Sequence, residues 1–262
     1  MKIAVCVKQI QDPEIATALF RVDEATNSVV PVAGLAPVMS PYDEQAIEAA
    51  LRIKDKQPDT KIVLITVGGP TAKEVLKQGL SMGADEAVLL SAPETMAVDG
   101  YVTASLLRDA VRKVEDVDLI LTGRQSADLD AGVVSCGLAE LLDIPAINFG
   151  MSVEVVDGKM IAERVLDNGS ETVEAPLPAL VAVSNEIGPA RKPSLREPMR
   201  SSRKPMAAWS PGDVSSENIE ARQDIVRLYI PKKDKHCEML AGANAEEVAG
   251  NLVRKLRSAR LI

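Results

Sequence analysis

Histidine, cysteine and aromatic residues are scarce in this chain, and their scarcity excludes several kinds of chemistry. The 262 residues include one histidine and three cysteines, which leaves no room for a histidine-based catalytic triad or a multi-histidine metal site. Cys6, Cys136 and Cys237 lie far apart without a CxxC pair, so the sequence contains neither a zinc motif nor a disulfide framework. Aromatic residues make up 2% of the chain, too few for a platform that stacks single-stranded nucleic acid.

Positive charge and long apolar runs are also in short supply. The chain has 30 Lys and Arg against 38 Asp and Glu, a net charge of −8, which argues against general binding to nucleic acid or to an anionic membrane. No apolar run approaches the ~20 residues of a membrane span, and the chain opens on an apolar run rather than a signal peptide. We therefore expect a cytoplasmic protein with an aliphatic core and no direct membrane insertion.

Apolar runs alternate with amphipathic segments through the first half of the chain. The runs are residues 2–8, 62–67, 87–90 and 117–122. Ser40 and Pro41 read as the cap and first residue of one helix, and a capping box at Thr71 opens a second helix that ends at Gly83. Further helices are expected near residues 102–114 and over 132–142. Strands and helices that alternate at this spacing predict an α/β fold with a doubly wound, mostly parallel sheet.

After Pro145 the sequence pattern changes to one that is typical of antiparallel strands. Residues 152–156, 160–165 and 171–174 alternate apolar and polar side chains, and Asp157-Gly158 and Asn168-Gly169 separate them. Such dipeptides favour tight hairpin turns. We expect an antiparallel hairpin extension on the sheet, followed by one more buried strand at residues 179–183.

From Pro189 the sequence stops resembling a protein core. Residues 191–204 carry six basic side chains against Glu197, and the apolar Leu195 and Met199 between prolines favour a partner-docking loop. Residues 205–262 have scattered apolar anchors such as Trp209 and a last amphipathic helix, too few to form a core of their own. We expect an α/β nucleotide-binding domain at 1–188, a recognition loop at 189–204, and a partner-wrapping arm at 205–262.

The segment LILTGRQSADLDAGVV, residues 119–134, is the most informative for chemistry. A strand ends at a glycine, passes through a polar loop and enters a helix, and ligands of open parallel sheets bind at such strand ends near helix N-termini. The small residues would admit a phosphate, and Arg124 could supply a charge. An ordinary strand-to-helix connection fits the pattern equally well. Neither a phosphate-binding P-loop nor a dinucleotide GxGxxG occurs.

Six blocks in order along the chain resemble the β subunit of electron transfer flavoproteins. They are VCVKQIQD, SPYDEQAIEAALRIK, LSMGADEAVLL, DLILTGRQSADLDAG, AERVLDNGSETVEAPLPALVAV and PSLREPM. The resemblance implies a Rossmann-like, adenine-nucleotide-binding subunit of a heterodimer whose α subunit binds the redox-active FAD. It also implies an electron carrier without catalytic side chains of its own. Such a carrier takes electrons from acyl-CoA-type dehydrogenases and passes them to a membrane quinone oxidoreductase.

The resemblance also implies which residues form the nucleotide pocket and the docking loop. Leu195 matches the leucine that the family inserts into a partner dehydrogenase. Independently of the resemblance, the positive charge of Arg191 and Arg196 near Leu195 would steer an acidic partner. The pocket residues carried over are Cys6, Ser40, Pro41, Tyr42, Asp43, Val67, Gly68, Gly123, Arg124, Gln125, Ser126, Asp128, Leu129, Asp130, Ala131, Gly132, Val133 and Val134.

The chain departs from the family pattern where the phosphate would bind. Ala131–Val134 replace polar residues with small and apolar ones, so phosphate contacts would rely on backbone N–H groups. Residues 98–103 lack a polar pair associated with flavin in this pocket, and the tail VRLYIPKK resembles single-flavin members. These features favour AMP as a structural nucleotide. A second FAD in a bifurcating, NADH-oxidising subunit remains an alternative, as does a stand-alone ATP-binding protein.

Overall fold

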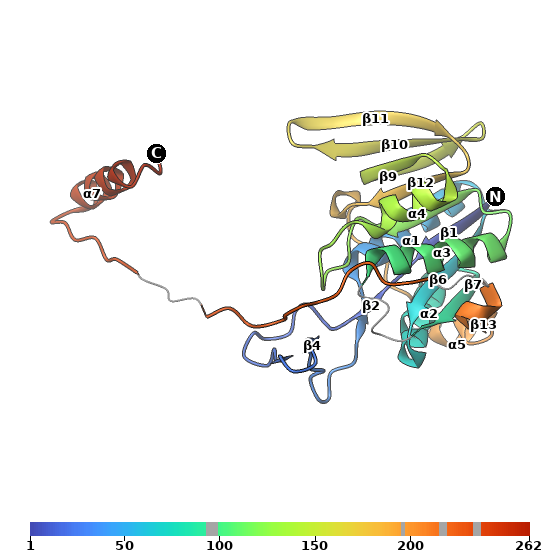
Figure 1. Ribbon diagram of the computed structural model, residues 1–262. Helices are drawn as coiled ribbons and strands as arrows, with labels where there is room; N and C mark the ends of the chain where they lie inside the picture. The colour runs from blue at the N-terminus through green and yellow to red at the C-terminus, as the bar shows by residue number, and fades with distance from the viewer. Residues whose placement is uncertain (93–98, 195–196, 215–218, 233–236) are drawn as a thin grey trace. The chain divides into compact units, whose positions relative to one another are not determined.

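The chain folds into two compact units in this computed structural model. The structure describes residues 1–92, 99–194, 197–214, 219–232 and 237–262. Met1–Leu228 form the first unit, here called the α/β unit, and Tyr229–Ile262 form the second, the C-terminal unit. The C-terminal unit contains helix α7 (Ala245–Ser258), none of whose side chains is buried (Figure 1).

Nine strands form one central sheet among the described residues, in the order β11-β10-β9-β12-β8-β1-β6-β7-β13. Neighbours from β9 to β13 run parallel, whereas β10 is antiparallel to both of its neighbours, β9 and β11. This confirms the predicted α/β class with an antiparallel extension. The strands are β1 (Lys2–Cys6), β6 (Lys61–Gly68), β7 (Glu86–Ser91), β8 (Leu119–Gly123), β9 (Ala146–Val156), β10 (Lys159–Leu166), β11 (Gly169–Pro176), β12 (Ala179–Val183) and β13 (Met206–Trp209).

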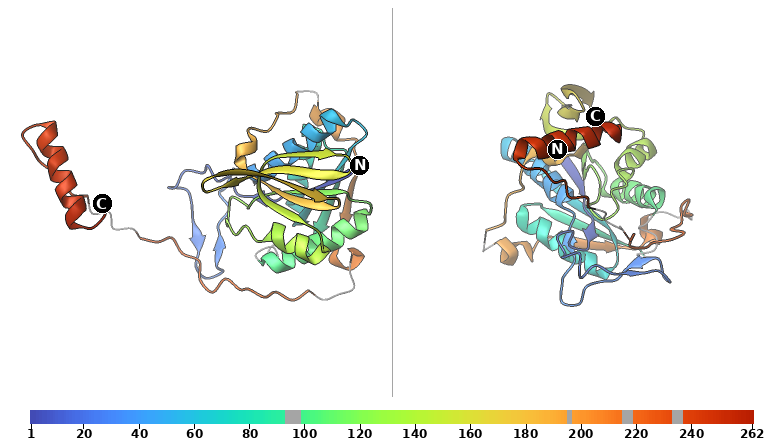
Figure 2. Two further views of the ribbon diagram at one scale, coloured as in Figure 1. Left: turned by 90° about the horizontal axis from the view of Figure 1, so that it is seen from above. Right: turned by 90° about the vertical axis from the view of Figure 1, so that its left-hand side faces the viewer.

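Helices cover both faces of the parallel strands (Figure 2). Helices α1 (Pro41–Lys56) and α2 (Lys73–Met82) pack on the face to which Ile3 and Val5 point. Helices α3 (Gly100–Val114) and α4 (Val134–Leu142) pack on the opposite face, with Ala4 and Cys6. The alternation along β1 is the period of two that places successive side chains on opposite faces of a sheet. Shorter helices are η1 (Pro70–Ala72), η3 (Asn185–Ile187), α5 (Glu197–Ser201) and α6 (Pro211–Val214).

The helix ends agree with the sequence signals at some positions and not at others. Ser40 occupies the N-cap position of α1, but its side chain makes no capping hydrogen bond. The predicted capping box at Thr71 is wrong: Thr71 lies in η1, and its hydroxyl donates to Gln9 Oε1 at 2.8 Å. Gly83, with φ of 137°, ends α2 as predicted. Helix α4 begins at Val134 because Gly132 is left-handed, with φ of 64°.

The antiparallel extension contains the two predicted hairpins. Asp157 and Gly158 form the first turn with φ of 50° and 75°, values that suit a tight hairpin. In the second hairpin Leu166 pairs with Gly169, so the loop residues are Asp167 and Asn168, one position earlier than predicted.

The sheet extends further along the chain than the sequence suggested. Strand β13 pairs with β7, from Met206 opposite Ala87 to Trp209 opposite Leu90. Trp209, which we expected to anchor the chain on a partner, therefore belongs to this sheet, and the compact α/β unit extends to Leu228. Two small sheets were not predicted: β2 (Gln9–Ile10) with β5 (Val38–Met39), and β3 (Val22–Asp23) with β4 (Ser28–Val29).

Candidate functional site

A cavity of about 110 Å³ lies at the carboxyl ends of β1, β6 and β8, beside the first turns of α3 and α4. This edge is where open α/β sheets bind ligands, because loops and helix N-termini converge there. The cavity brings together eleven of the eighteen predicted pocket residues. They are Cys6, Asp43, Val67, Gly123, Arg124, Gln125, Ser126, Leu129, Ala131, Gly132 and Val134.

Asp43 forms the floor of the cavity and joins two strand ends. Its carboxylate accepts the backbone N–H of Lys8 at 2.8 Å and of Gly123 at 3.1 Å. Burial raises the pKa of Asp43 to about 7, although these two hydrogen bonds and the nearby charge of Lys8 act in the opposite direction. A Cβ on Gly123 would lie 2.5 Å from Asp43 Oδ1 and 2.9 Å from the backbone carbon of Tyr42. Only glycine lets α1 approach β8 this closely.

The inner wall of the cavity is apolar. Cys6, Val67 and Leu107 contribute to it, and Cys6 is almost fully buried. Burial, together with the charge of Asp43, raises the pKa of the Cys6 thiol to about 12, so the thiol stays protonated and behaves as a small apolar side chain. An apolar lining of this kind suits a nucleobase.

The outer end of the cavity is polar and carries two cations. Lys8 Nζ contacts both carboxylate oxygens of Asp128, at 2.9 and 2.8 Å, and reaches Ser126 Oγ at 3.5 Å. The loop from β8 enters α4 at this end, and the first backbone N–H groups of a helix form a natural anion site. Lys8 was not among the predicted residues.

Arg124 is the second cation of the polar end. Its guanidinium carbon lies 5.1 Å from the centroid of the Tyr42 ring and 5.5 Å from that of Phe149, within the range of cation–π attraction. Nη1 donates to Ser184 Oγ at 3.4 Å, whereas Nε is buried without a hydrogen-bond partner among the described residues. A buried donor without a partner is costly, so this end of the cavity has unused capacity to donate to a ligand.

Seven predicted residues lie outside the cavity lining. Asp128 pairs with Lys8, and Asp130 accepts a hydrogen bond from Gln125 at 2.8 Å. No cluster of metal-ligating side chains occurs in the part of the chain that the structure describes. The seven are Ser40, Pro41, Tyr42, Gly68, Asp128, Asp130 and Val133.

Seven lining residues were missed from the sequence. Lys8 could have been predicted because it directly follows a buried apolar run. Thr103 and Leu107 could have been predicted as a pair, because residues i and i+4 share one face of a helix. Thr103 matters most, because its hydroxyl is buried without a partner among the described residues. The seven are Val7, Lys8, Gly100, Thr103, Leu107, Thr122 and Ser135.

The predicted docking residues are described only in part. Leu195 and Arg196 lie outside the described residues. Arg191 is bound within the chain: its guanidinium contacts Glu48 at 2.8 Å and Asp55 at 2.7 Å, and its backbone N–H donates to Glu48 at 3.0 Å. Both carboxylates belong to α1, so Arg191 ties the start of the loop to that helix.

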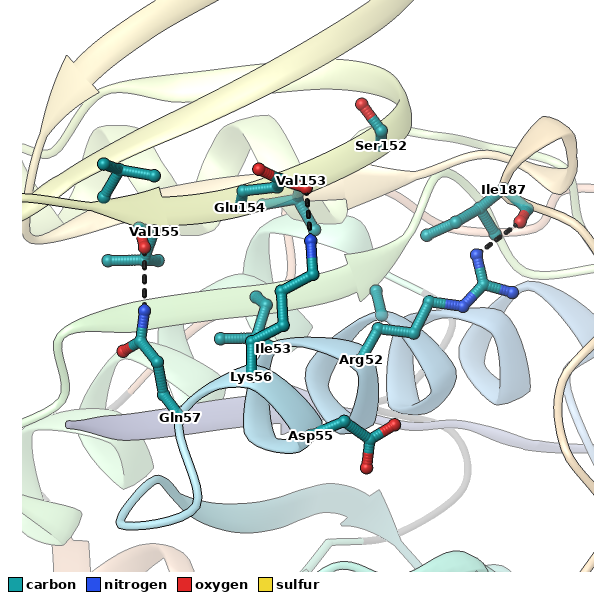
Figure 3. Close-up of a pocket in the computed structure, with 12 residues that line it drawn as sticks. Arg52, Ile53, Asp55, Lys56, Gln57, Ser152, Val153, Glu154, Val155 and Ile187 are labelled. Carbon is teal, nitrogen blue, oxygen red and sulfur yellow. Dashed lines mark hydrogen bonds and ion pairs between the residues drawn. The ribbon is translucent and has the colours of Figure 1, made fainter.

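A larger cavity, of about 420 Å³, lies between α1 and β9 (Figure 3). Several of its polar side chains hold α1 to β9 or to η3. Lys56 Nζ contacts Glu154 Oε1 at 2.5 Å, Gln57 Nε2 donates to the carbonyl of Val155 at 2.8 Å, and Arg52 Nη1 donates to the carbonyl of Ile187 at 2.8 Å. These contacts indicate a structural joint, so the smaller cavity is the candidate ligand site.

Comparisons with known proteins decide the family. Residues 30–214 match the family model of the electron transfer flavoprotein domain. The chain is 34% identical over its whole length, and over the whole length of the relative, to the caffeyl-CoA reductase-Etf complex subunit CarD of Acetobacterium woodii. This chain belongs to the electron transfer flavoprotein β-subunit family. The resemblance seen in the six sequence blocks is thereby confirmed.

Other β subunits of electron transfer flavoproteins resemble the chain to the same degree. The protein from Megasphaera elsdenii is 33% identical, covering 84% of this chain and 82% of its own, and that from Bacillus subtilis is 34% identical, covering 84% and 86%. As a β subunit, the chain has an electron transfer flavoprotein α subunit as its expected partner. No helix within the described ranges has the length and apolar character needed to cross a bilayer.

Proposed function

We propose that this chain is the AMP-binding β subunit of a heterodimeric electron carrier whose FAD is held mainly by the α subunit. The carrier accepts electrons from an acyl-CoA-type dehydrogenase and passes them to a membrane quinone oxidoreductase. The redox chemistry belongs to the flavin, and the β subunit supplies binding, orientation and charge. The observation that carries the proposal is the small cavity at the strand ends, with an apolar wall on one side and two cations on the other.

The residues present fit an adenine nucleotide. Cys6, Val67 and Leu107 would contact the base, and the unpartnered hydroxyl of Thr103 would donate to it or to the ribose. Lys8, Arg124 and the entry to α4 would hold the phosphate. Ala131–Val134, which offer a phosphate backbone N–H groups rather than side-chain donors, and the tail VRLYIPKK favour AMP over a second FAD.

A second candidate is a bifurcating β subunit with its own FAD, which oxidises NADH. The relative from Acetobacterium woodii favours it, because its name places it in a complex with a caffeyl-CoA reductase and the match covers both chains completely. That name also supports a CoA-thioester oxidoreductase as the partner of this chain. A stand-alone ATP-binding protein is disfavoured by membership of the β-subunit family.

The nucleotides released from the purified heterodimer test the proposal. Mass spectrometry and the visible spectrum should give one AMP and one FAD per heterodimer. Two FAD molecules and no AMP per heterodimer would contradict the AMP-binding carrier and support the bifurcating subunit. A chain that purifies alone with ATP would overturn both.

Leu195 is proposed as the apolar anchor of the docking loop. Burying a leucine in a partner pocket contributes about 2 kcal/mol, which corresponds to about 30-fold in affinity. Leu195→Ala should therefore raise, by that factor, the dehydrogenase concentration that gives half-maximal flavin reduction. Nucleotide content and the flavin spectrum should not change. An unaltered concentration dependence would remove Leu195 from the docking site.

A further inference from the structure

Asp99 is a buried carboxylate that makes two sets of contacts. It precedes α3 at the carboxyl edge of the sheet, and 2% of its surface is exposed. Oδ1 accepts the backbone N–H of Tyr101 at 2.7 Å and of Val102 at 3.2 Å, which caps the N-terminus of α3. An aspartate at this position is among the preferred N-caps. The cap accounts for one of the two oxygens.

The other oxygen binds a distant part of the chain. Oδ2 accepts the backbone N–H of Arg222, and that of Gln223 at 2.8 Å. The Arg222 guanidinium carbon also lies 3.4 Å from the centroid of the Tyr101 ring, a close cation–π contact. Burial raises the pKa of Asp99, but the four N–H groups outweigh it and hold the pKa below the usual range. The carboxylate is therefore charged when it makes these bonds.

Residues 219–228, here called the exit segment, lead from this contact into the C-terminal unit (Figure 1). A second anchor lies in the turn between β3 and β4. Asn27, with φ of 50°, donates from Nδ2 to the carbonyl of Ile225 at 3.1 Å and accepts the N–H of Leu228 at 3.0 Å. The exit segment is thus held at two separate points.

Only the Asp99 anchor adjoins the candidate nucleotide cavity. Gly100 and Thr103, in the turn that Asp99 caps, line the cavity, and Leu107 lines it one turn later. Neither Asn27 nor any residue of the β3–β4 hairpin is among the described lining residues. The same helical turn therefore faces the ligand on one side and is fixed to the exit segment on the other.

We propose that Asp99 is a positioning residue that couples nucleotide occupancy of the cavity to the attachment of the exit segment. A ligand that orders the first turn of α3 strengthens both the cap and the anchor. By linkage, an attached exit segment favours ligand binding by the same factor. The identity of the ligand rests on the proposed function, whereas the anchor rests on the contacts of Asp99. The path of the chain toward the α subunit would then depend on whether nucleotide is bound.

Limited digestion of the full-length chain with trypsin tests the coupling. Cleavage after Arg222 and Arg227 requires the exit segment to detach, so its rate reports the open population. In Asp99→Asn, one oxygen remains for the helix cap, but an amide NH2 faces the N–H groups of Arg222 and Gln223. Asn27→Gly is the matched control, because it releases the second anchor, keeps the left-handed backbone without strain and leaves the cavity wall intact.

Each variant has its own expected digestion pattern. Free AMP at ten times its Kd should slow wild-type cleavage after Arg222 by up to about tenfold. Asp99→Asn should be cleaved at least about tenfold faster, because the backbone N–H groups of Arg222 and Gln223 both lose their charged acceptor, and AMP should no longer slow it. Asn27→Gly should be cleaved faster after Arg227, yet AMP should still protect Arg222. Tyr101→Leu keeps the carboxylate but removes the ring under Arg222, so its cleavage after Arg222 should be faster than wild type by a smaller factor. This variant replaces Asp99→Asn in the test if circular dichroism shows that Asp99→Asn has lost helix.

Calorimetry on the same samples separates the two proposals. Binding of AMP to the wild-type chain without slower cleavage would overturn the coupling. If AMP does not bind, the proposed nucleotide is wrong and FAD becomes the probe. Protection by FAD would then support the coupling, and failure of FAD to protect would overturn it. Wild-type rates of cleavage in Asp99→Asn would overturn the anchor itself.

Discussion

The parallel and antiparallel halves of the central sheet differ in burial and in what their loops do. Strands β1, β8 and β12 are buried along almost their whole length, with helices on both faces. Strands β9 and β10 mix buried with partly or fully exposed residues, and β11 has one buried residue. Parallel strands bring their carboxyl ends to one edge, whereas antiparallel strands reverse at each hairpin. The candidate ligand site is accordingly built by the parallel half, and the antiparallel half contributes surface.

Glycine substitutions in the two halves should show the largest contrast. A Cβ on Gly123 would meet Asp43 and the backbone of Tyr42 at 2.5 to 2.9 Å, whereas a Cβ on Gly158 would meet nothing within 4 Å. Gly123→Ala should therefore lower the free energy of unfolding by about 3 kcal/mol, as overpacking against backbone does. Gly158→Ala should cost only about 1 kcal/mol, for its left-handed backbone. Urea denaturation of both variants measures the difference, and equal losses would contradict the close approach of α1 to β8.

The buried carboxylate of the parallel half should give stability a distinctive dependence on pH. Because burial raises the pKa of Asp43 from 3.8 to about 7, the folded chain binds more protons than the unfolded chain between those values. Its contribution to stability is therefore present at low pH and lost as pH rises toward 7. Wild type should lose about 2 kcal/mol relative to Asp43→Asn between pH 5 and pH 7. Urea titrations at both pH values measure this, and parallel pH profiles would refute it.

Gly132 tests whether the loop before α4 binds phosphate. A Cβ there would lie 3.7 Å from the Arg124 carbonyl, so space is available, but the φ of 64° is left-handed. Gly132→Val should distort the loop through backbone strain of about 1–2 kcal/mol, which weakens AMP binding about tenfold. Gly132→Asn is the control, because asparagine tolerates this conformation. Titration calorimetry measures the Kd for AMP, and an unchanged Kd in the valine variant would place the phosphate elsewhere.

The exposed ion pair between α1 and the antiparallel half should matter least. Lys56 and Glu154 have side chains that are 64% and 52% exposed, and pairs at such sites contribute about 0.2–1 kcal/mol. Lys56→Ala should shift the urea midpoint only slightly and should leave nucleotide content unchanged. A large loss of nucleotide would show that the joint in Figure 3 controls the ligand site.

Local signals account for the parts of the fold that the sequence predicted. The buried runs, the glycine that ends α2 and the Asp157-Gly158 turn depend on residues within a few positions of one another. Strand β13 was missed because its pairing with β7 joins residues about 120 positions apart. The short run MAAW has no local feature that distinguishes it from an arm lying on a partner.

The candidate site was predicted to the extent that it lies on one continuous segment. Residues 123–134 follow a strand and precede a helix, and most of them line the cavity. Lys8 reaches the site from the segment after β1, which the strand order places beside β8, and Thr103 and Leu107 reach it from α3, which packs on one face of the sheet. The spacing of residues along the chain does not reveal the order of the strands in space. The resemblance to the family identified only part of the cavity lining.

The burial of Cys6 leaves the other two thiols as natural attachment points for probes. A thiol with its pKa raised to about 12 reacts slowly with maleimides near neutral pH, whereas Cys136 on α4 and Cys237 in the C-terminal unit are exposed. One thiol lies beside the candidate nucleotide site and the other on the segment beyond Leu228. A donor and an acceptor dye on these two positions would report, by resonance energy transfer and without any engineered cysteine, how the C-terminal unit moves when the α subunit binds.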